Sequence, residues 1–148
     1  MAQRINYAKL APSGIAALEA LQSHVDDSGL DHALLELVKT RASQLNACAY
    51  CIDMHTKDAR AAGESEQRLY GLSAWREAPY YSDRERAALA WTEAVTHIRG
   101  DIGDDLFEPL RAHFSDKEIV DLTLAVIAIN SWNRVAISFR TLPGSYKS

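Results

Sequence analysis

The chain has 148 residues, of which 47% are hydrophobic and 24% are charged, and this composition fits one globular domain rather than two domains or a disordered chain. The 16 Lys and Arg against 20 Asp and Glu give a formal net charge of -4. This balance argues against a nucleic-acid partner, because such proteins present a basic surface. The longest nearly unbroken apolar run, residues 122–129, is far shorter than the roughly 20 residues that cross a bilayer, so we expect no membrane span. The N-terminal residues lack the apolar segment of a secretory signal, and a cytoplasmic location is expected.

Gly and Pro are sparse, and the alternating pattern of β-strands is hard to find, so the sequence predicts an all-α protein. Capping residues and apolar periodicity predict helices over residues 13–27, 31–45, 47–62, 65–74, 82–98, 105–113 and 115–139. The expected N-caps are Ser13, Asp31, Ser82 and Ser115, the last two in capping boxes. The helix over 115–139 is apolar almost all round in its first half and is expected at the centre. The fold class is therefore a single-domain helical bundle over residues 1–148.

The two cysteines, Cys48 and Cys51, lie in one four-residue block near the predicted start of a helix. Two cysteines are too few for a disulfide scaffold, and a reducing cytosol would not keep a structural bridge closed. A bridge between residues so close in sequence also constrains almost nothing. Their spacing therefore points to chemistry rather than to a structural role.

On a helix, Cys48, Cys51 and His55 stand at i, i+3 and i+7, which puts two thiols and an imidazole on one face. Glu36 lies twelve residues before Cys48 on the preceding helix, and a turn at Asn46 would let its carboxylate fold back toward His55. A helix N-terminus favours a thiolate, and a histidine held by a carboxylate can take or relay a proton. A second thiol nearby can resolve an oxidised first one. The pattern favours a redox dithiol.

Two other interpretations stay open at this level. Zinc could take Cys48, Cys51 and His55 as ligands with Glu36, His32 or a water as the fourth, although structural zinc sites usually pair a CxxC with a second ligand pair. The cysteines could also be two buried small apolar side chains. The redox interpretation is preferred, and it requires no metal and no cofactor. Covalent haem attachment is excluded because Ile52, not histidine, follows the second cysteine.

One motif of the chain consists of Glu36, then eleven residues, then Cys48-x-x-Cys51-x-x-x-His55. This motif resembles the signature of alkylhydroperoxidase D-like proteins of the carboxymuconolactone decarboxylase superfamily. The Ala-Ala-Gly stop after the motif and the segment Ile129–Arg134 are also similar to this group, so the resemblance covers most of the chain. It implies an all-helical fold that assembles into homo-oligomers, either trimers or hexamers. It also implies that the dithiol lies at the foot of a pocket near subunit contacts.

The resemblance further implies that Cys51 is deprotonated by Glu36 through His55 and a water, attacks a hydroperoxide, and is resolved by Cys48. The characterised enzymes of this type also carry a histidine where this chain has Tyr50. A phenol donates a hydrogen bond but is no base near neutral pH. Tyr50 is therefore expected to contact substrate, and Trp132 is expected to form part of the pocket wall.

The implied function is that of a dithiol peroxidase-like oxidoreductase with peroxiredoxin activity. Its partners would be a hydroperoxide and a dithiol reductant, either a lipoyl group or a thioredoxin-like protein, or a partner peroxiredoxin. Two alternatives remain: a redox switch or binding module without rapid turnover, and an enzyme of the carboxymuconolactone decarboxylase type. The dithiol argues against the second, because decarboxylases of the superfamily do not depend on it.

Overall fold

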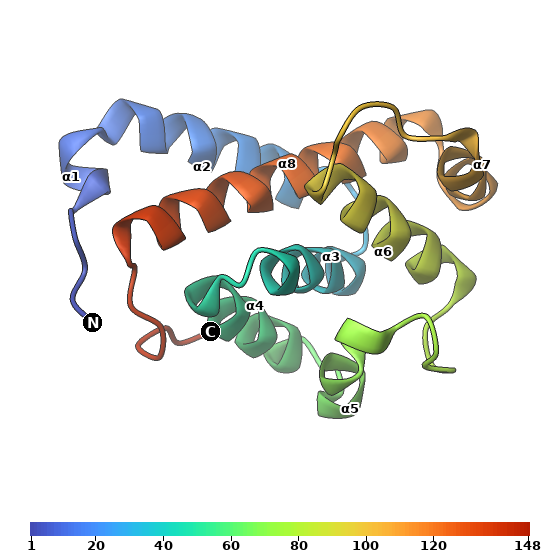
Figure 1. Ribbon diagram of the computed structural model, residues 1–148, viewed down its shortest axis with the longest axis horizontal. Helices are drawn as coiled ribbons and strands as arrows, with labels where there is room; N and C mark the ends of the chain where they lie inside the picture. The colour runs from blue at the N-terminus through green and yellow to red at the C-terminus, as the bar shows by residue number, and fades with distance from the viewer.

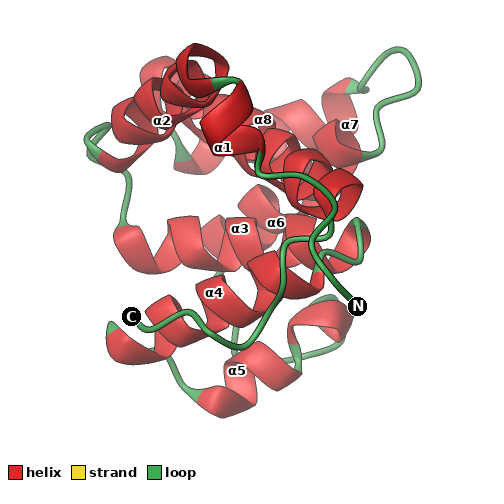
Figure 2. Ribbon diagram, turned by 90° about the vertical axis from the view of Figure 1, so that its left-hand side faces the viewer, coloured by secondary structure: helices red, strands yellow, loops and turns green.

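The computed structural model describes residues 1–148 and contains helices and loops but no strand (Figure 2). The predicted all-α fold class is therefore confirmed. Eight α-helices and one short 3-10 helix follow in order: α1 Tyr7–Leu10, α2 Pro12–Asp26, α3 His32–Leu45, α4 Ala49–Ala61, α5 Glu66–Tyr70, η1 Leu72–Ala74, α6 Asp83–Thr96, α7 Asp104–His113 and α8 Asp116–Phe139.

Helix α3 is the hub of the bundle, because it packs against α4, α6 and α8. Helices α2 and α8 lie side by side, with α8 between α2 and α3, and α7 stands at the opposite end of the molecule from α1 (Figure 1). The largest apolar cluster joins α2, α3, α6, α7 and α8 through side chains such as Leu34, Trp91, Leu110 and Leu122. A smaller cluster, centred on Leu37, Leu72 and Leu89, fixes α5 and η1 beneath them.

Most predicted caps are present. Asp31 accepts a hydrogen bond from the Leu34 amide, and both Ser82 and Ser115 form complete capping boxes with a glutamate three residues later. The Ser13 cap is wrong: α2 begins at Pro12, whose fixed φ suits the first helical position, and Ala11 stands at the N-cap.

Some helix boundaries also differ from the expected ones. The element expected over 65–74 divides at Gly71 into α5 and η1, and α6 ends at Thr96 rather than at residue 98. The short helix α1, capped by the Asn6 side chain, was not predicted.

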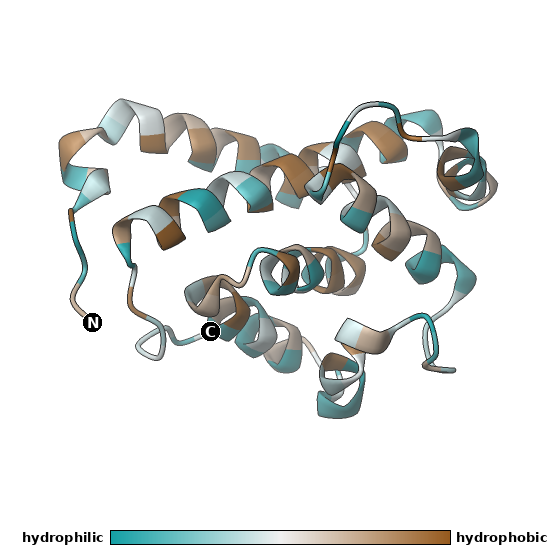
Figure 3. Cartoon of the chain, viewed as in Figure 1, coloured by the Kyte–Doolittle hydropathy of each residue, from teal (hydrophilic) through white to brown (hydrophobic).

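Helix α8 lies at the centre, as predicted, and most of its length is hydrophobic (Figure 3). The expectation of no membrane span considered only the shorter run of residues 122–129. By length and composition alone, the whole helix Asp116–Phe139 is long and apolar enough to cross a membrane. Its contacts with α2, α3 and α6 place Asp121 and Asn133 inside the protein. The core helix of a soluble protein meets the same criterion.

Candidate functional site

The turn between α3 and α4 sets the position of the cysteines. Asn46 ends α3, and Ala47 has a φ of 54°, a left-handed conformation that non-glycine residues rarely adopt. The Asn46 side-chain amide donates to the side-chain oxygens of Asn130 and Asn133 on α8, both at 2.9 Å. The Asn133 amide in turn donates to the Ser43 hydroxyl at 3.0 Å. These bonds attach the turn to the central helix and thereby hold the start of α4 in place.

The two cysteines occupy the first turn of α4, as predicted. Cys48 is the N-cap residue, Cys51 follows in the first turn, and their side chains form a disulfide with a Cα–Cα distance of 5.4 Å. Amide groups in the first turn of a helix lack acceptors within the helix, so they favour a negative charge nearby. Both cysteines are about 1% exposed and belong to a small apolar cluster with Ala42, Ile129 and Ala136.

Glu36 and His55 meet, as the sequence analysis expected. His55 Nδ1 lies 3.0 Å from Glu36 Oε2, and both side chains are buried. The second Glu36 oxygen accepts a hydrogen bond of 3.1 Å from the buried ammonium group of Lys39. Lys39 also lies 3.5 Å from Asp26 of α2. Lys39 was not predicted, although its i+3 spacing from Glu36 on α3 was a usable signal.

These neighbours decide the protonation of Glu36. Burial alone would raise the pKa of its carboxyl group, but the hydrogen bond and charge of His55, together with Lys39, hold that pKa below the ordinary value of 4.5. Glu36 is therefore a carboxylate at neutral pH and can only accept hydrogen bonds. Since His55 Nδ1 must then donate, a neutral His55 ring carries its lone pair on Nε2.

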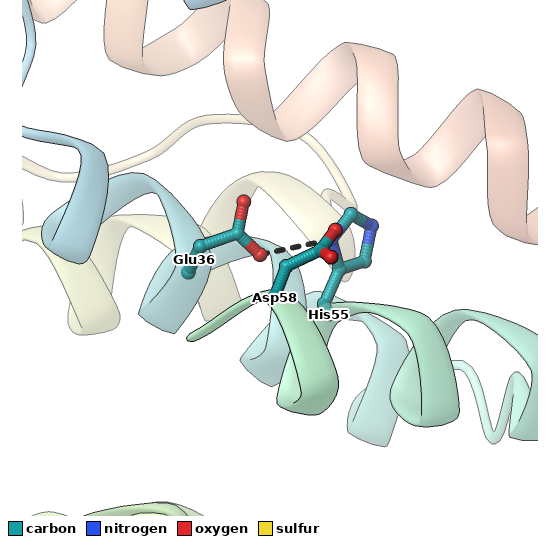
Figure 4. A group of neighbouring side chains, drawn as sticks. All are labelled: Glu36, His55 and Asp58. Carbon is teal, nitrogen blue, oxygen red and sulfur yellow. Dashed lines mark hydrogen bonds and ion pairs between the residues drawn. The ribbon is translucent and has the colours of Figure 1, made fainter. Parts of the chain in front are cut away.

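Asp58 of α4 also belongs to the site, although it was not among the predicted candidate residues. Its carboxylate lies beside the Glu36–His55 pair (Figure 4) and accepts a hydrogen bond of 2.8 Å from the Tyr146 hydroxyl. That bond raises the pKa of Tyr146 to about 12, so the phenol stays protonated and remains a donor. Asp58 follows Cys51 by seven residues and His55 by three, and this helical spacing could have identified it.

A pocket of about 680 Å³ opens above Cys51. Cys51 is part of its lining and Cys48 is not. The lining includes Tyr50, which was expected to contact substrate, Trp132, which was expected in the pocket wall, and Met54, which was not predicted. Burial raises the pKa of Tyr50, so its hydroxyl remains a hydrogen-bond donor.

The pocket also contains the residues that could hold a metal ion. One donor atom each of Glu36, His55 and Asp58 lies within 4.8 Å of the others. A cation there would compete with Lys39, whose ammonium group already pairs with Glu36. The predicted zinc alternative used the two cysteines, and in the disulfide neither sulfur is a thiolate that could bind zinc.

Comparisons with known proteins show the family of the chain. Residues 12–94, which include Glu36, both cysteines and His55, match the carboxymuconolactone decarboxylase family. The uncharacterized protein YdfG of Bacillus subtilis is 43% identical over 139 residues, covering 93% of this chain and 95% of that protein.

Two crystal structures are similar over most of the chain. An Agrobacterium tumefaciens protein of unknown function, proposed to be an antioxidant defence protein AhpD, is 50% identical with a TM-score of 0.93, covering 98% of this chain and 100% of that one. An uncharacterized peroxidase-related protein from Silicibacter sp. TM1040 is 27% identical with a TM-score of 0.79, covering 88% of this chain and 70% of that one. This protein therefore belongs to the carboxymuconolactone decarboxylase family, as a member of the AhpD-like type.

Proposed function

We propose that the protein is a dithiol peroxidase that reduces organic hydroperoxides through a thiol–disulfide cycle of Cys51 and Cys48. The observation that carries the proposal is the asymmetry of the pair: Cys51 lines the pocket together with His55, whereas Cys48 does not line it, although both cysteines belong to the same apolar cluster. A substrate in the pocket meets Cys51 first. The similarity to a protein that is itself proposed to be an antioxidant defence protein AhpD supports the same chemistry.

His55 and Glu36 act on the proton of Cys51. The Nε2 lone pair of His55 takes the thiol proton, and the Glu36 carboxylate, bonded to Nδ1, stabilises the imidazolium that results. The position of Cys51 in the first turn of α4 stabilises the thiolate. Tyr50, with its protonated hydroxyl, donates a hydrogen bond to the hydroperoxide.

The cycle balances in atoms and electrons. The Cys51 thiolate attacks the outer peroxide oxygen, so that an S–O bond forms and the O–O bond breaks. The alkoxide leaves with the proton from His55 as an alcohol, and Cys51 is a sulfenic acid. Cys48 then attacks the Cys51 sulfur, the disulfide forms, and hydroxide leaves with the Cys48 proton as water. A dithiol reductant returns both thiols by exchange, supplying the two electrons that the hydroperoxide accepted.

The test uses matched serine variants of the reduced, metal-free protein and one equivalent of cumene hydroperoxide. Thiols are counted before and after, and intact mass identifies the products. We expect the wild type to lose both thiols and two hydrogen atoms, Cys48→Ser to gain one oxygen atom, and Cys51→Ser to keep its thiol and its mass. A Cys51→Ser variant that reacts at the wild-type rate would contradict the assigned roles.

Turnover separates an enzyme from a redox switch. With a dithiol reductant in excess, a peroxidase consumes hydroperoxide catalytically and saturably, whereas a switch stops after one equivalent. If the wild-type thiols survive the hydroperoxide altogether, the peroxidase proposal is wrong.

A further inference from the structure

The pocket above Cys51 has two chemically different walls. One wall is a polar stripe of α2 with the helical spacing i, i+3, i+4 and i+7, made of Glu19, Gln22, Ser23 and Asp26. The other wall comes from α1, α4 and α8 and is largely apolar, made of Tyr7, Tyr50, Met54, Trp132 and Ala136. Such a pocket suits a ligand whose apolar group packs against the aromatic wall and faces the polar wall across the pocket.

The charged side chains of the pocket are mostly acidic. Four carboxylates line it against a single ammonium group, that of Lys39, which gives a net charge of -3 with neutral imidazoles; the four are Glu19, Asp26, Glu36 and Asp58. Protonating both lining histidines, His32 and His55, would still leave -1. The Glu19 side chain is exposed on α2 and forms no hydrogen bond or ion pair with another side chain.

We infer that the pocket discriminates among organic hydroperoxides by their charge, and that it disfavours those that carry a carboxylate. The inference rests on the proposed function and names the substrate class of the same site. The chemistry at Cys51 is unchanged, because only the electrostatic work of bringing the substrate into the pocket differs. The same field would also disfavour a lactone that carries a carboxylate, the type of substrate that a decarboxylase of this superfamily acts on.

The size of the effect follows from Coulomb's law. Three net charges acting on a substrate carboxylate at about 10 Å through water give roughly a tenfold lower rate constant at low salt. Each charge accounts for about a twofold change, so removing one should lower the discrimination to roughly fivefold, and reversing one should lower it to about twofold. Salt screens the interaction and should reduce the discrimination further.

The experiment compares three hydroperoxides with one apolar body: cumene hydroperoxide, its para-carboxylate derivative and its para-trimethylammonium derivative. The pre-reduced protein is mixed with each at about 0.01 M ionic strength, and thiol loss gives a second-order rate constant without any added reductant. Each constant is divided by that of a small free dithiol under the same conditions, which removes differences in intrinsic reactivity. We expect the anion to react about tenfold more slowly than the neutral compound and the cation at least as fast.

Variants connect the effect to the pocket. Glu19→Gln should reduce the rate penalty on the anionic hydroperoxide, and Glu19→Lys should reduce it further. Glu108→Gln is the matched control, because Glu108 is exposed on α7, at the opposite end of the molecule from α1 (Figure 1). Equal corrected rates for the three compounds, or an equal change in the control variant, would overturn the inference while leaving the peroxidase proposal intact. No reaction with cumene hydroperoxide would overturn both.

Discussion

Replacing Glu36 with glutamine removes the negative charge that both Lys39 and His55 contact. Lys39 lies 3.1 Å from one oxygen of Glu36 and His55 lies 3.0 Å from the other, while the side chains of Glu36 and Lys39 are 3% and 6% exposed. Loss of one partner from a buried ion pair costs about 3–5 kcal/mol. Asp26 remains 3.5 Å from Lys39 but is half exposed, and the glutamine can still accept a hydrogen bond. We therefore expect Glu36→Gln to lower the free energy of unfolding by about 2 kcal/mol.

Urea denaturation followed by helical circular dichroism measures this change. In a chain of this length, about 2 kcal/mol corresponds to a fall in Tm of roughly 4–8 °C. A second variant, Glu36→Gln with Lys39→Met, removes both charges and should be more stable than Glu36→Gln alone, because no unpaired ammonium group remains buried. If the double variant is no more stable than the single one, Lys39 is not held by Glu36 and the reasoning fails.

Thiol oxidation gives the second readout of the same variant. The glutamine cannot stabilise an imidazolium at His55 as a carboxylate does, so the rate constant with cumene hydroperoxide should fall by about 10²–10⁴-fold. Lys39→Met alone leaves the Glu36–His55 pair in place and should lose far less. An unchanged rate in Glu36→Gln would remove Glu36 from the proposed proton relay.

Two further predictions concern pH and the support of the turn. The pKa of Glu36 in the folded protein lies below its ordinary value of 4.5, so its contribution to stability is present above pH 4.5 and is lost as the pH falls through the folded pKa. The difference in unfolding free energy between wild type and Glu36→Gln should therefore shrink in that pH window. A difference that stays constant down to acid unfolding would contradict the prediction. Asn133→Leu removes hydrogen bonds to Asn46 and Ser43 at a fully buried position, so it should lower the free energy of unfolding by about 3 kcal/mol and slow the oxidation of Cys51. Urea denaturation measures the first effect and thiol loss measures the second. Wild-type stability together with a wild-type oxidation rate would show that this network does not hold the turn.

Local sequence patterns predicted the parts of the protein that depend on neighbours along the chain. Helix spacing put Cys51 and His55 on one face of α4, and the caps at Asp31, Ser82 and Ser115 depend on a side chain three residues from its amide partner. Glu36 could be assigned to His55 because only one turn separates their helices. Such interactions can be predicted from the sequence because helical geometry fixes which residues meet.

Tertiary structure alone decided how distant segments complete the pocket. Tyr146 reaches Asp58 across 88 residues, Asn46 meets Asn133 across 87, and the polar stripe of α2 faces Cys51 only because α2 packs beside α8. The boundary errors, in contrast, are local: Pro12 rather than Ser13 begins α2, and Gly71 divides α5 from η1. The sequence by itself determined the dithiol, its histidine and its carboxylate, since these depend on spacing within and between adjacent helices. The acidity of the pocket depends on which faces of separate helices come together, and packing of the whole chain fixes that.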